Sequence, residues 1–287
     1  MTAPPRFFAD YQRRVESELR RLVPGAGDRV EEAMAYTLHA ESKRVRGLLT
    51  MLAAEICGGS SNHAAAAAAA IEMVHAASLI LDDLPSMDDA PLRRGQPASH
   101  VAFGEAIALL AAFGLLNGAY AAVARAYDAA TSAALTTRLS DAVGTDGLIG
   151  GQAADLLATD QSITFEMLER IHRGKTGALF SAAATAGAIT AAGPAPAIAA
   201  LQAFAKNLGL AFQIIDDLID VEGDTALSGK PVLSDAKKTT FVSFSGPAGA
   251  RQLASELCRT SEAALEPFGR RADRLRDLAG YVAARMA

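Results

Sequence analysis

Long apolar stretches, interrupted by glycine, proline and aspartate, follow one another along the chain. Residues 71–81 contain one formally charged residue, Glu72, and residues 208–215 form a second apolar stretch. Such stretches are typical of helices that are buried on most sides. Breaks at residues 24–27, 58–61, 144–147 and 193–194 separate segments of helix length. The pattern predicts one domain over residues 1–287, with about ten helices, little or no sheet and an N-terminal helical segment at residues 1–28.

Alanine supplies much of the apolar fraction, which is 51% of the 287 residues, whereas aromatic residues make up 6%. Residues 64–70 are all alanine, the best helix former and a poor strand former. We therefore predict an all-α protein with closely packed helices. The net charge of −5 argues against a nucleic-acid-binding protein with a basic surface. Cys57 and Cys258 form no ligand-spaced pair, which excludes a disulfide framework and a cysteine zinc site.

Two parts of the sequence bear on membrane association. Residues 1–10 lack the apolar core of a signal peptide, which favours a cytoplasmic protein. Residues 176–204 contain no charged residue, but they are rich in small residues and are divided by Pro194 and Pro196. A membrane span needs about 20 strongly apolar residues, so we predict two buried helices here and no membrane span.

Aspartates cluster at the end of each of the two apolar stretches. The first cluster is Asp82, Asp83, Asp88 and Asp89, and the second is Asp216, Asp217 and Asp220. In a helix Asp216 and Asp220 share one face, whereas Pro85 disturbs the geometry of the first cluster. A single such cluster is typical of a solvated helix end. Two of them after buried helices favour Mg²⁺ or Mn²⁺ bound by carboxylate oxygens and bridging to a phosphorylated ligand.

Basic residues that could bind the phosphates of such a ligand occur at several places. They are Lys43 and Arg46, Arg93 and Arg94, Lys175 beside Thr176, and Lys230 and Lys238. His75 lies two turns before Asp82 on a comparable helix face. Each of these alone is typical of a surface charge or, for His75, of a hydrogen-bonded core histidine. Their joint pattern indicates a metal–diphosphate site.

The motifs resemble those of the trans-isoprenyl diphosphate synthases, over about residues 40–245. Residues 74–95 resemble the first aspartate-rich motif of that family, DDxxxxD followed by RRG, and residues 216–220 resemble the second, DDxxD. Residues 151–156, 175–177 and 212–213 are similar to shorter signatures. The segments HAASLILDD and DAKKTTFV look most like bacterial geranylgeranyl diphosphate synthases of carotenoid pathways.

The resemblance implies an all-α fold around a central cavity, a homodimer, and isopentenyl diphosphate and an allylic diphosphate (dimethylallyl, geranyl or farnesyl) as substrates. It implies that Mg²⁺, and through it the allylic diphosphate, is bound by Asp82, Asp83, Asp88, Asp216 and Asp220. The same diphosphate would contact Arg93, Lys175, Thr176, Gln213 and Lys230. Isopentenyl diphosphate would be held by Lys43, Arg46, His75 and Arg94. The catalytic candidates are Asp82, Asp83, Asp88, Asp216 and Lys175.

One segment departs from the family pattern. The family's Gly-Gly-Lys-Arg-x-Arg-Pro is replaced at residues 41–47 by Glu-Ser-Lys-Arg-Val-Arg-Gly, which keeps the cations but not the glycines or the proline. This departure leaves a non-catalytic regulatory subunit of a heteromeric synthase as an alternative. A terpene cyclase is disfavoured because its second metal motif has another pattern.

The implied chemistry is ionisation of the allylic diphosphate, condensation with isopentenyl diphosphate and loss of a proton, with the departed diphosphate as the base. Ala77 and Ser78 lie about one turn before Asp82 and are small. One turn of about 5.4 Å is close to the length of one isoprene unit. We therefore expect a C20 product, geranylgeranyl diphosphate, with a C15 product as the alternative. Phe113, on another helix, is a second candidate for the floor of the cavity.

Overall fold

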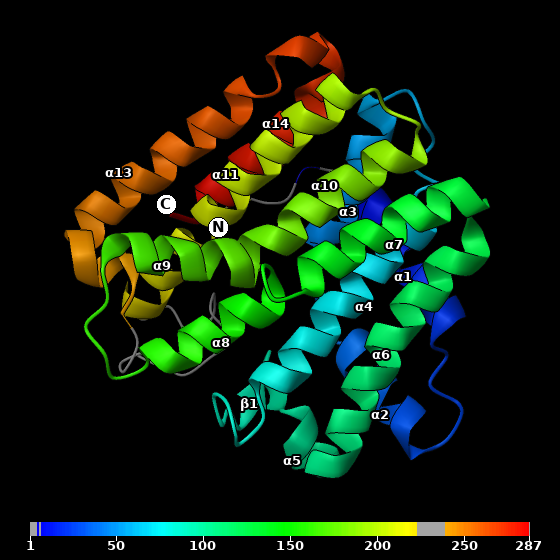
Figure 1. Cartoon of the computed structure of the whole chain (residues 1–287), viewed down its shortest axis with the longest axis vertical. Helices are drawn as coiled ribbons and strands as arrows, with labels where there is room; N and C mark the ends of the chain where they lie inside the picture. Colours follow the sequence, from blue (N-terminus) through cyan, green and yellow to red (C-terminus); the bar gives the residue numbers. More distant parts are fainter. Residues whose placement is uncertain (1–4, 6, 223–238, 287) are drawn as a thin grey trace.

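Helices joined by short loops make up almost all of the described chain (Figure 1). This computed structural model describes residue 5 and residues 7–222 and 239–286. Its α-helices are α1 (Phe8–Leu22), α2 (Arg29–Leu38), α3 (Val45–Ile56), α4 (Ala65–Asp82), α5 (Ser99–Phe103), α6 (Glu105–Ala126), α7 (Ala129–Val143), α8 (Leu148–Ala158), α9 (Phe165–His172), α10 (Ala178–Thr190), α11 (Ala195–Glu222), α13 (Phe241–Ala263) and α14 (Asp273–Ala283). Shorter turns are the π-helix η1 (Arg173–Gly177) and the 3₁₀ helices η2 (Glu266–Ala272) and η3 (Ala284–Met286). The predicted all-α fold is confirmed.

Strand structure in the described part of the chain is limited to one hairpin. Its strands β1 (Leu92–Arg93) and β2 (Gln96–Pro97) are antiparallel, with Leu92 opposite Pro97 and Arg93 opposite Gln96. Arg94 and Gly95, which join them, both have positive φ, 55° and 75°. Positive φ at both central residues is the requirement of a tight type I′ turn. The hairpin directly follows the first aspartate cluster.

Polar side chains fix where several of the helices begin. Asp28 accepts hydrogen bonds from backbone N–H groups at the start of α2, and Asp128 does the same for α7. Thr164 caps α9, and Thr240 caps α13 in a capping box with Ser243. These bonds satisfy backbone donors that the first helical turn leaves without an intrahelical partner.

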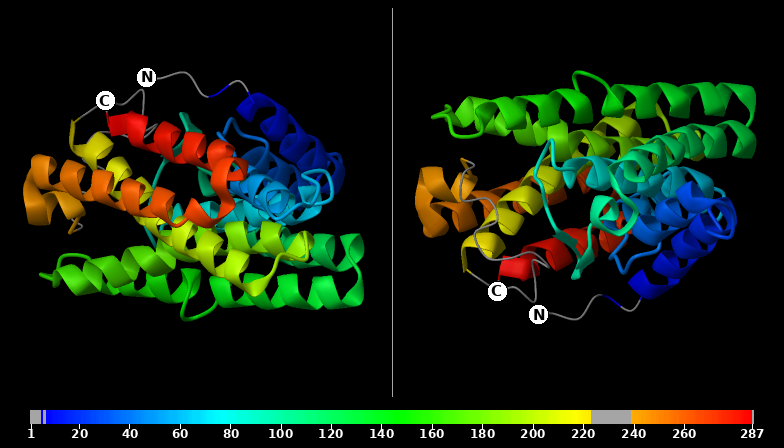
Figure 2. Two further views of the ribbon diagram at one scale, coloured as in Figure 1. Left: turned by 90° about the horizontal axis from the view of Figure 1, so that it is seen from above. Right: turned by 90° about the horizontal axis from the view of Figure 1, so that it is seen from below.

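The alanine-rich helix α4 lies in the core and packs against α1, α3, α6 and α10. Small residues let the helices around it approach closely. At Gly187 of α10, for example, a Cβ atom would lie 2.0 Å from the carbonyl oxygen of Thr50 in α3. Figure 2 shows the green helices of the middle of the chain along one side, with the blue N-terminal and red C-terminal helices on the other. Phe8 of α1 contacts Tyr281 of α14, with 5.2 Å between ring centroids.

The charge-free residues 176–204 form two helical pieces, as predicted. The first runs from the end of η1 through α10, and α11 begins at Ala195, between Pro194 and Pro196. By length and composition alone, α4, α6 and α11 are long and apolar enough to cross a membrane. Within the most apolar 18-residue window of each helix, the buried share is 67% for α4, 50% for α11 and 39% for α6. The absence of a membrane span stays a prediction, and α6 is the helix that presents most of its apolar surface outward.

Candidate active site

A cavity of about 340 Å³ lies where α4, α8, η1 and α11 meet, a volume in the range of small-molecule sites. Carboxylates line one part, which we call the acidic side: Asp82, Asp88, Asp155, Asp216 and Asp220. Arg46, His75 and Arg94 line another part, which we call the basic cluster. The remaining polar lining includes Arg93, Lys175, Thr176, Gln213 and Arg285. The two aspartate clusters, more than 120 residues apart in the sequence, therefore face a single cavity.

The first aspartate cluster reaches the cavity because the chain folds back after α4. The N–H of Asp88 donates to the carbonyl of Asp82 at 2.9 Å, and the N–H of Ala90 donates to that of Asp83 at 3.2 Å. Pro85 ends the helix, and Asp89 has a positive φ of 46°. This turn brings the carboxylates of Asp82 and Asp88 to the same wall.

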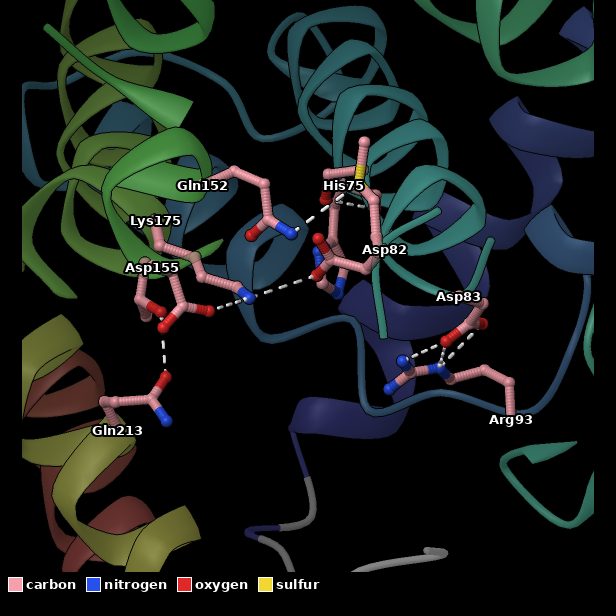
Figure 3. Close-up of polar contacts among 11 residues, drawn as sticks. His75, Asp82, Asp83, Arg93, Gln152, Asp155, Lys175 and Gln213 are labelled. Carbon is pink, nitrogen blue, oxygen red and sulfur yellow. Dashed lines mark hydrogen bonds and ion pairs between the residues drawn. The ribbon is translucent and has the colours of Figure 1, made fainter. Parts of the chain in front are cut away.

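Asp83 points away from the cavity and pairs with Arg93 of the hairpin (Figure 3). The Nε of Arg93 lies 3.1 and 3.0 Å from the two carboxylate oxygens, and Nη2 also donates to Oδ1. Burial by itself lowers the pKa of Arg93, but the hydrogen bond and charge of Asp83 raise the pKa above its usual value. Asp83 thus holds the guanidinium of Arg93 in place. The resemblance implied instead that Asp83 binds the metal directly.

Lys175 lies between two carboxylates of the acidic side, Asp155 of α8 and Asp82 of α4. Its Nζ is 2.8 Å from Asp155 Oδ2 and 3.7 Å from Asp82 Oδ2 (Figure 3). The π-turn η1 carries Lys175, and single π-turns of this kind are frequent at functional sites. The position depends on glycine, because a Cβ at Gly151 of α8 would lie 2.3 Å from the backbone nitrogen of Lys175.

The second aspartate cluster stays helical in α11. Asp216 and Asp220 line the cavity, as the helical spacing predicted. Asp216 Oδ1 is 2.7 Å from Arg285 Nη2 of η3. Asp217, which also borders the cavity, is buried and accepts hydrogen bonds from Gln213 at 3.0 Å and from the N–H of Phe241 at 3.1 Å.

Gln213 also ties α11 to η1. Its Oε1 accepts a hydrogen bond from the hydroxyl of Thr176 at 2.9 Å. Thr176 and Gln213, two of the residues that the resemblance assigned to the allylic diphosphate, therefore contact each other at the cavity wall.

The basic cluster joins residues from α3, α4 and the hairpin. Arg46 Nη1 lies 3.5 Å from His75 Nε2, and its guanidinium lies over the ring of Phe180, 4.6 Å from the centroid. Burial and the charge of Arg46 lower the pKa of His75 well below its usual value. A guanidinium can only donate hydrogen bonds, so this contact fits a neutral His75 that accepts at Nε2. Burial, followed by the charge of Arg44, lowers the pKa of Arg94 to about 10, so it remains a cation at neutral pH.

Some predicted residues lie elsewhere. Lys43 does not line the cavity, and its Nζ lies 5.6 Å from the centroid of the Tyr281 ring. Ala77 is buried and is not part of the cavity wall, because Ser78, four residues before Asp82, shares the helix face of Asp82 and Ala77 does not. Phe113 is 65% exposed on α6 and forms no floor within this chain. Lys230 and Lys238 lie among residues 223–238, which are outside the described residues.

Three ionisable lining residues outside the two aspartate clusters were not predicted as site residues: Asp155, His172 and Arg285. Asp155 belongs to the short signature at residues 151–156, and this membership was the signal that could have identified it. His172 lies three residues before Lys175, and this proximity was a weaker signal. Arg285 lies far from every motif, so no sequence signal pointed to it.

The donors present fit Mg²⁺ only together with other ligands. Within residues 5, 7–222 and 239–286, no three His, Cys, Asp or Glu side chains are close enough to hold a metal ion by themselves. Mg²⁺ commonly binds through one or two carboxylates together with water and substrate phosphates. In addition, Arg46 Nε and the Nε and Nη1 of Arg285 are buried and have no hydrogen-bond partner among the described residues. Carboxylates that could share a metal ion with phosphates, and guanidinium nitrogens of Arg46 and Arg285 without partners, suit diphosphate oxygens as the missing ligands.

The helical fold and this cavity define an all-α protein with a candidate site for phosphorylated ligands. Residues 28–257, more than half of the chain, match the polyprenyl synthetase family, and the chain belongs to this family.

Relatives carry two kinds of name. The chloroplastic geranylgeranyl pyrophosphate synthase of Capsicum annuum is 40% identical over 263 residues, which cover 89% of this chain and 71% of that protein. The farnesyl diphosphate synthase of Bacillus subtilis is 36% identical over 287 residues and 97% of both chains. The crystal structure of an FPP/GFPP synthase from Zymomonas mobilis is similar with a TM-score of 0.86 and 34% identity, covering 96% of this chain and 97% of that one.

Proposed function

We propose that this protein condenses isopentenyl diphosphate with an allylic diphosphate in a Mg²⁺-dependent reaction and releases geranylgeranyl diphosphate, a C20 carotenoid precursor. The observation that carries this proposal is that one cavity is lined both by aspartates from two clusters and by Arg46, His75 and Arg94. A reaction that joins two prenyl diphosphates needs a binding place for each diphosphate group. Only the diphosphate group of the allylic substrate is released.

The acidic side is the place for the allylic diphosphate. Asp82, Asp88, Asp216 and Asp220 would hold Mg²⁺, which when bound neutralises the diphosphate and stabilises the negative charge that grows as it departs. Lys175 and Arg93 supply fixed positive charge at the same place, and Thr176 and Gln213 supply hydrogen bonds. Fixed donors aimed at developing charge are among the largest contributions to catalysis.

The basic cluster is the place for the isopentenyl diphosphate. Arg46 and Arg94 can grip phosphate oxygens bidentately, and a neutral His75 can donate from its Nδ1–H. No carboxylate pairs directly with Arg46 or Arg94 in the described part of the chain. This substrate keeps its diphosphate, so direct arginine contacts without a metal suit it.

Apolar residues beside the two diphosphate places would hold the prenyl chains. Leu79, Leu179, Phe212 and Ile219 line the cavity and would exclude water from the allylic cation after ionisation. The double bond of isopentenyl diphosphate then attacks C1 of that cation, a carbon–carbon bond forms, and a proton passes to the departed diphosphate. No side chain needs to serve as the base in this scheme.

The length of the product depends on the depth of the cavity behind Asp82. The small Ser78 lines the wall, whereas the small Ala77 is buried and outside the wall; a small residue at the wall supports the C20 product. The farnesyl diphosphate synthases among the relatives favour C15 as the second candidate. We expect Ser78→Tyr, at the wall itself, to shift the product from C20 towards C15, and an unchanged product length would reject this account of the cavity depth.

We also propose that two copies of the chain associate through α6. Leu109, Leu110 and Phe113 are exposed on this helix, at 36%, 52% and 65%. An apolar patch of this kind on a helix is typical of an interaction surface. Light scattering of the purified protein tests for the dimer.

The central experiment incubates the purified protein with isopentenyl diphosphate, Mg²⁺ and, in separate reactions, C5, C10 and C15 primers, and sizes the products. Product at C20 from the C15 primer supports the proposal, and products that stop at C15 support the alternative. No turnover with any primer would reject the enzyme and favour a regulatory subunit.

A further inference from the structure

A buried ion pair lies behind the basic cluster, between α3 and α4. Glu72 and Arg44 have side chains that are 2% and 3% exposed, with Oε2 and Nη1 3.7 Å apart. The other carboxylate oxygen of Glu72, Oε1, accepts a hydrogen bond of 2.8 Å from the N–H of Gly47. Glu72 thus contacts two points on either side of Arg46, one before it in the sequence and one after it.

The N–H of Gly47 belongs to the first turn of α3, where backbone donors have no partner within the helix. Glu72 supplies the missing acceptor from α4, and its negative charge also suits the positive end of the helix dipole. Arg44 has a positive φ of 50° and donates to the carbonyls of Leu38 at 2.6 Å and Ala40 at 3.3 Å. The turn before α3 is therefore held to α2 through Arg44 and to α4 through Glu72.

The position of the basic cluster depends on this arrangement. Arg46 lies between the two contact points, and His75 lies one turn after Glu72 on α4. The contact between Arg46 and His75 therefore needs the start of α3 to stay against α4. Glu72 also lies near enough to Arg46 and Arg94 for its charge to favour their protonated forms.

We propose that Glu72 is a positioning residue for the second diphosphate: it holds the first turn of α3 against α4 so that Arg46 and His75 converge in the basic cluster. The inference rests on the proposed function, because it assigns the basic cluster to isopentenyl diphosphate.

Two other roles for Glu72 predict different results. A merely stabilising ion pair would affect both substrates alike, and buried ion pairs are often weak contributors to stability. A merely electrostatic role would make the cluster more positive when the charge is removed, so isopentenyl diphosphate would bind more tightly. The positioning role predicts weaker binding of that substrate alone, so the sign and the selectivity of the change separate the three.

The experiment measures KM for each substrate in the wild type and in Glu72→Ala and Glu72→Gln. In Glu72→Ala, we expect the KM for isopentenyl diphosphate to rise about tenfold, the scale of one charge-assisted hydrogen bond, and the KM for the allylic primer to stay within about twofold. Glu72→Gln keeps an acceptor for Gly47 and should show a smaller rise, of about threefold. If the alanine variant does not fold, the glutamine variant carries the test.

Glu55→Gln is the matched control. Glu55 lies on the same helix α3 and forms an ion pair of 3.0 Å with Arg274 and a hydrogen bond of 2.6 Å with Tyr11, away from the cavity. This variant should lose stability and leave both KM values unchanged. An unchanged or lowered KM for isopentenyl diphosphate in the Glu72 variants, or an equal rise for both substrates, would overturn the inference.

Hydrogen exchange separates this inference from the proposed function. Faster amide exchange at residues 43–50 in the Glu72 variants, but not in Glu55→Gln, is expected whether or not the protein turns over substrate. A wild type without turnover rejects the proposed function, whereas unchanged exchange in the Glu72 variants rejects the positioning role.

Discussion

The acidic side and the basic cluster of the cavity differ in how their charges are balanced. On the acidic side, Asp155 and Lys175 pair with side chains that are 13% and 20% exposed, and Asp216 and Arg285 pair with side chains that are 38% and 11% exposed. Behind the basic cluster, the counter-charge is Glu72, which is 2% exposed and bonded to backbone. Glu72 is thus shielded from water and fixed to backbone, and removing one partner of a buried pair costs about 3–5 kcal/mol.

The comparison indicates that the two sides are built for different tasks. Aspartates whose partners are cationic side chains can exchange those partners for a metal ion, because a side chain can turn away without moving the backbone. Arginines with a fixed, buried counter-charge keep their geometry whether or not a ligand is bound. The acidic side therefore suits a group that arrives with metal and departs, and the basic cluster suits a group that is held unchanged.

The largest effect should follow from a change on the acidic side. Asp82→Asn removes a charged oxygen ligand from the cavity wall, and we expect kcat to fall about 10³-fold, the scale of one lost electrostatic catalytic group. Steady-state kinetics over a range of Mg²⁺ concentrations measure this loss. Asp89→Asn, an exposed neighbour that does not line the cavity, is the control and should retain activity. A near-normal kcat in Asp82→Asn would contradict the proposal that the acidic side binds Mg²⁺ and the allylic diphosphate.

The two aspartate clusters also differ in how far the sequence could predict them. Asp216 and Asp220 remain in a regular helix, so the helical period of α11 was enough to place them on one wall. Asp82 and Asp88 meet through a turn held by backbone hydrogen bonds after Pro85, which no period describes. The resemblance supplied their common role, but the turn itself had to be observed.

Longer-range contacts were less predictable still. The all-α fold followed from alanine content and breaker positions, because these act locally. The pairing of Lys175 with Asp155 depends on close approach of two glycine-containing segments, and the pairing of Arg285 with Asp216 depends on how the end of the chain packs. No regular spacing of residues in the sequence indicates either contact. The exclusion of Ala77 from the cavity wall was predictable from helix geometry, because Ser78 lies four residues before Asp82 and Ala77 lies five.

A change in the basic cluster should have the next largest effect. Arg94→Met removes a guanidinium from the cluster, and we expect the KM for isopentenyl diphosphate to rise about 10- to 100-fold, the scale of lost charge-assisted hydrogen bonds. The KM for the allylic primer should change much less. Arg270→Met is the control, because the Arg270 side chain is 99% exposed. Equal increases for the two substrates would contradict the separation of the two sides.

A third change tests whether backbone packing positions the cation of the acidic side. Gly151→Ala places a methyl group 2.3 Å from the backbone nitrogen of Lys175 and 2.7 Å from the carbonyl carbon of Gly174. Because the backbone must move, we expect a loss of about 1–3 kcal/mol in the free energy of unfolding and a reduced kcat. Denaturant unfolding and steady-state kinetics measure the two effects. Gly280→Ala, where a Cβ meets no atom within 4 Å, should be neutral or slightly stabilising. Similar behaviour of both variants would argue against the positioning of Lys175 by this contact.

The smallest expected effect concerns the protonation of the basic cluster. Burial and the charge of Arg46 hold the pKa of His75 well below its usual value, so the folded protein keeps this ring neutral. The unfolded chain binds a proton there below about pH 6.5, so the free energy of unfolding must fall as the pH falls below that value. Above about pH 6.5 the ring is neutral in both states, and its contribution does not change with pH.

We therefore compare urea unfolding of the wild type and of His75→Gln at about pH 7 and about pH 5.5. The wild type should lose up to about 1 kcal/mol more than the variant over this interval, because only its unfolded state gains a proton at residue 75. The pKa of His39 is also lowered, chiefly by burial, but His39 is present in both proteins and cancels in the difference. Equal losses would mean that His75 protonates as readily in the folded state as in the unfolded one. The basic cluster would then carry an additional positive charge at low pH. Its charge would therefore change with pH and would no longer be fixed, which would contradict the proposed difference from the acidic side.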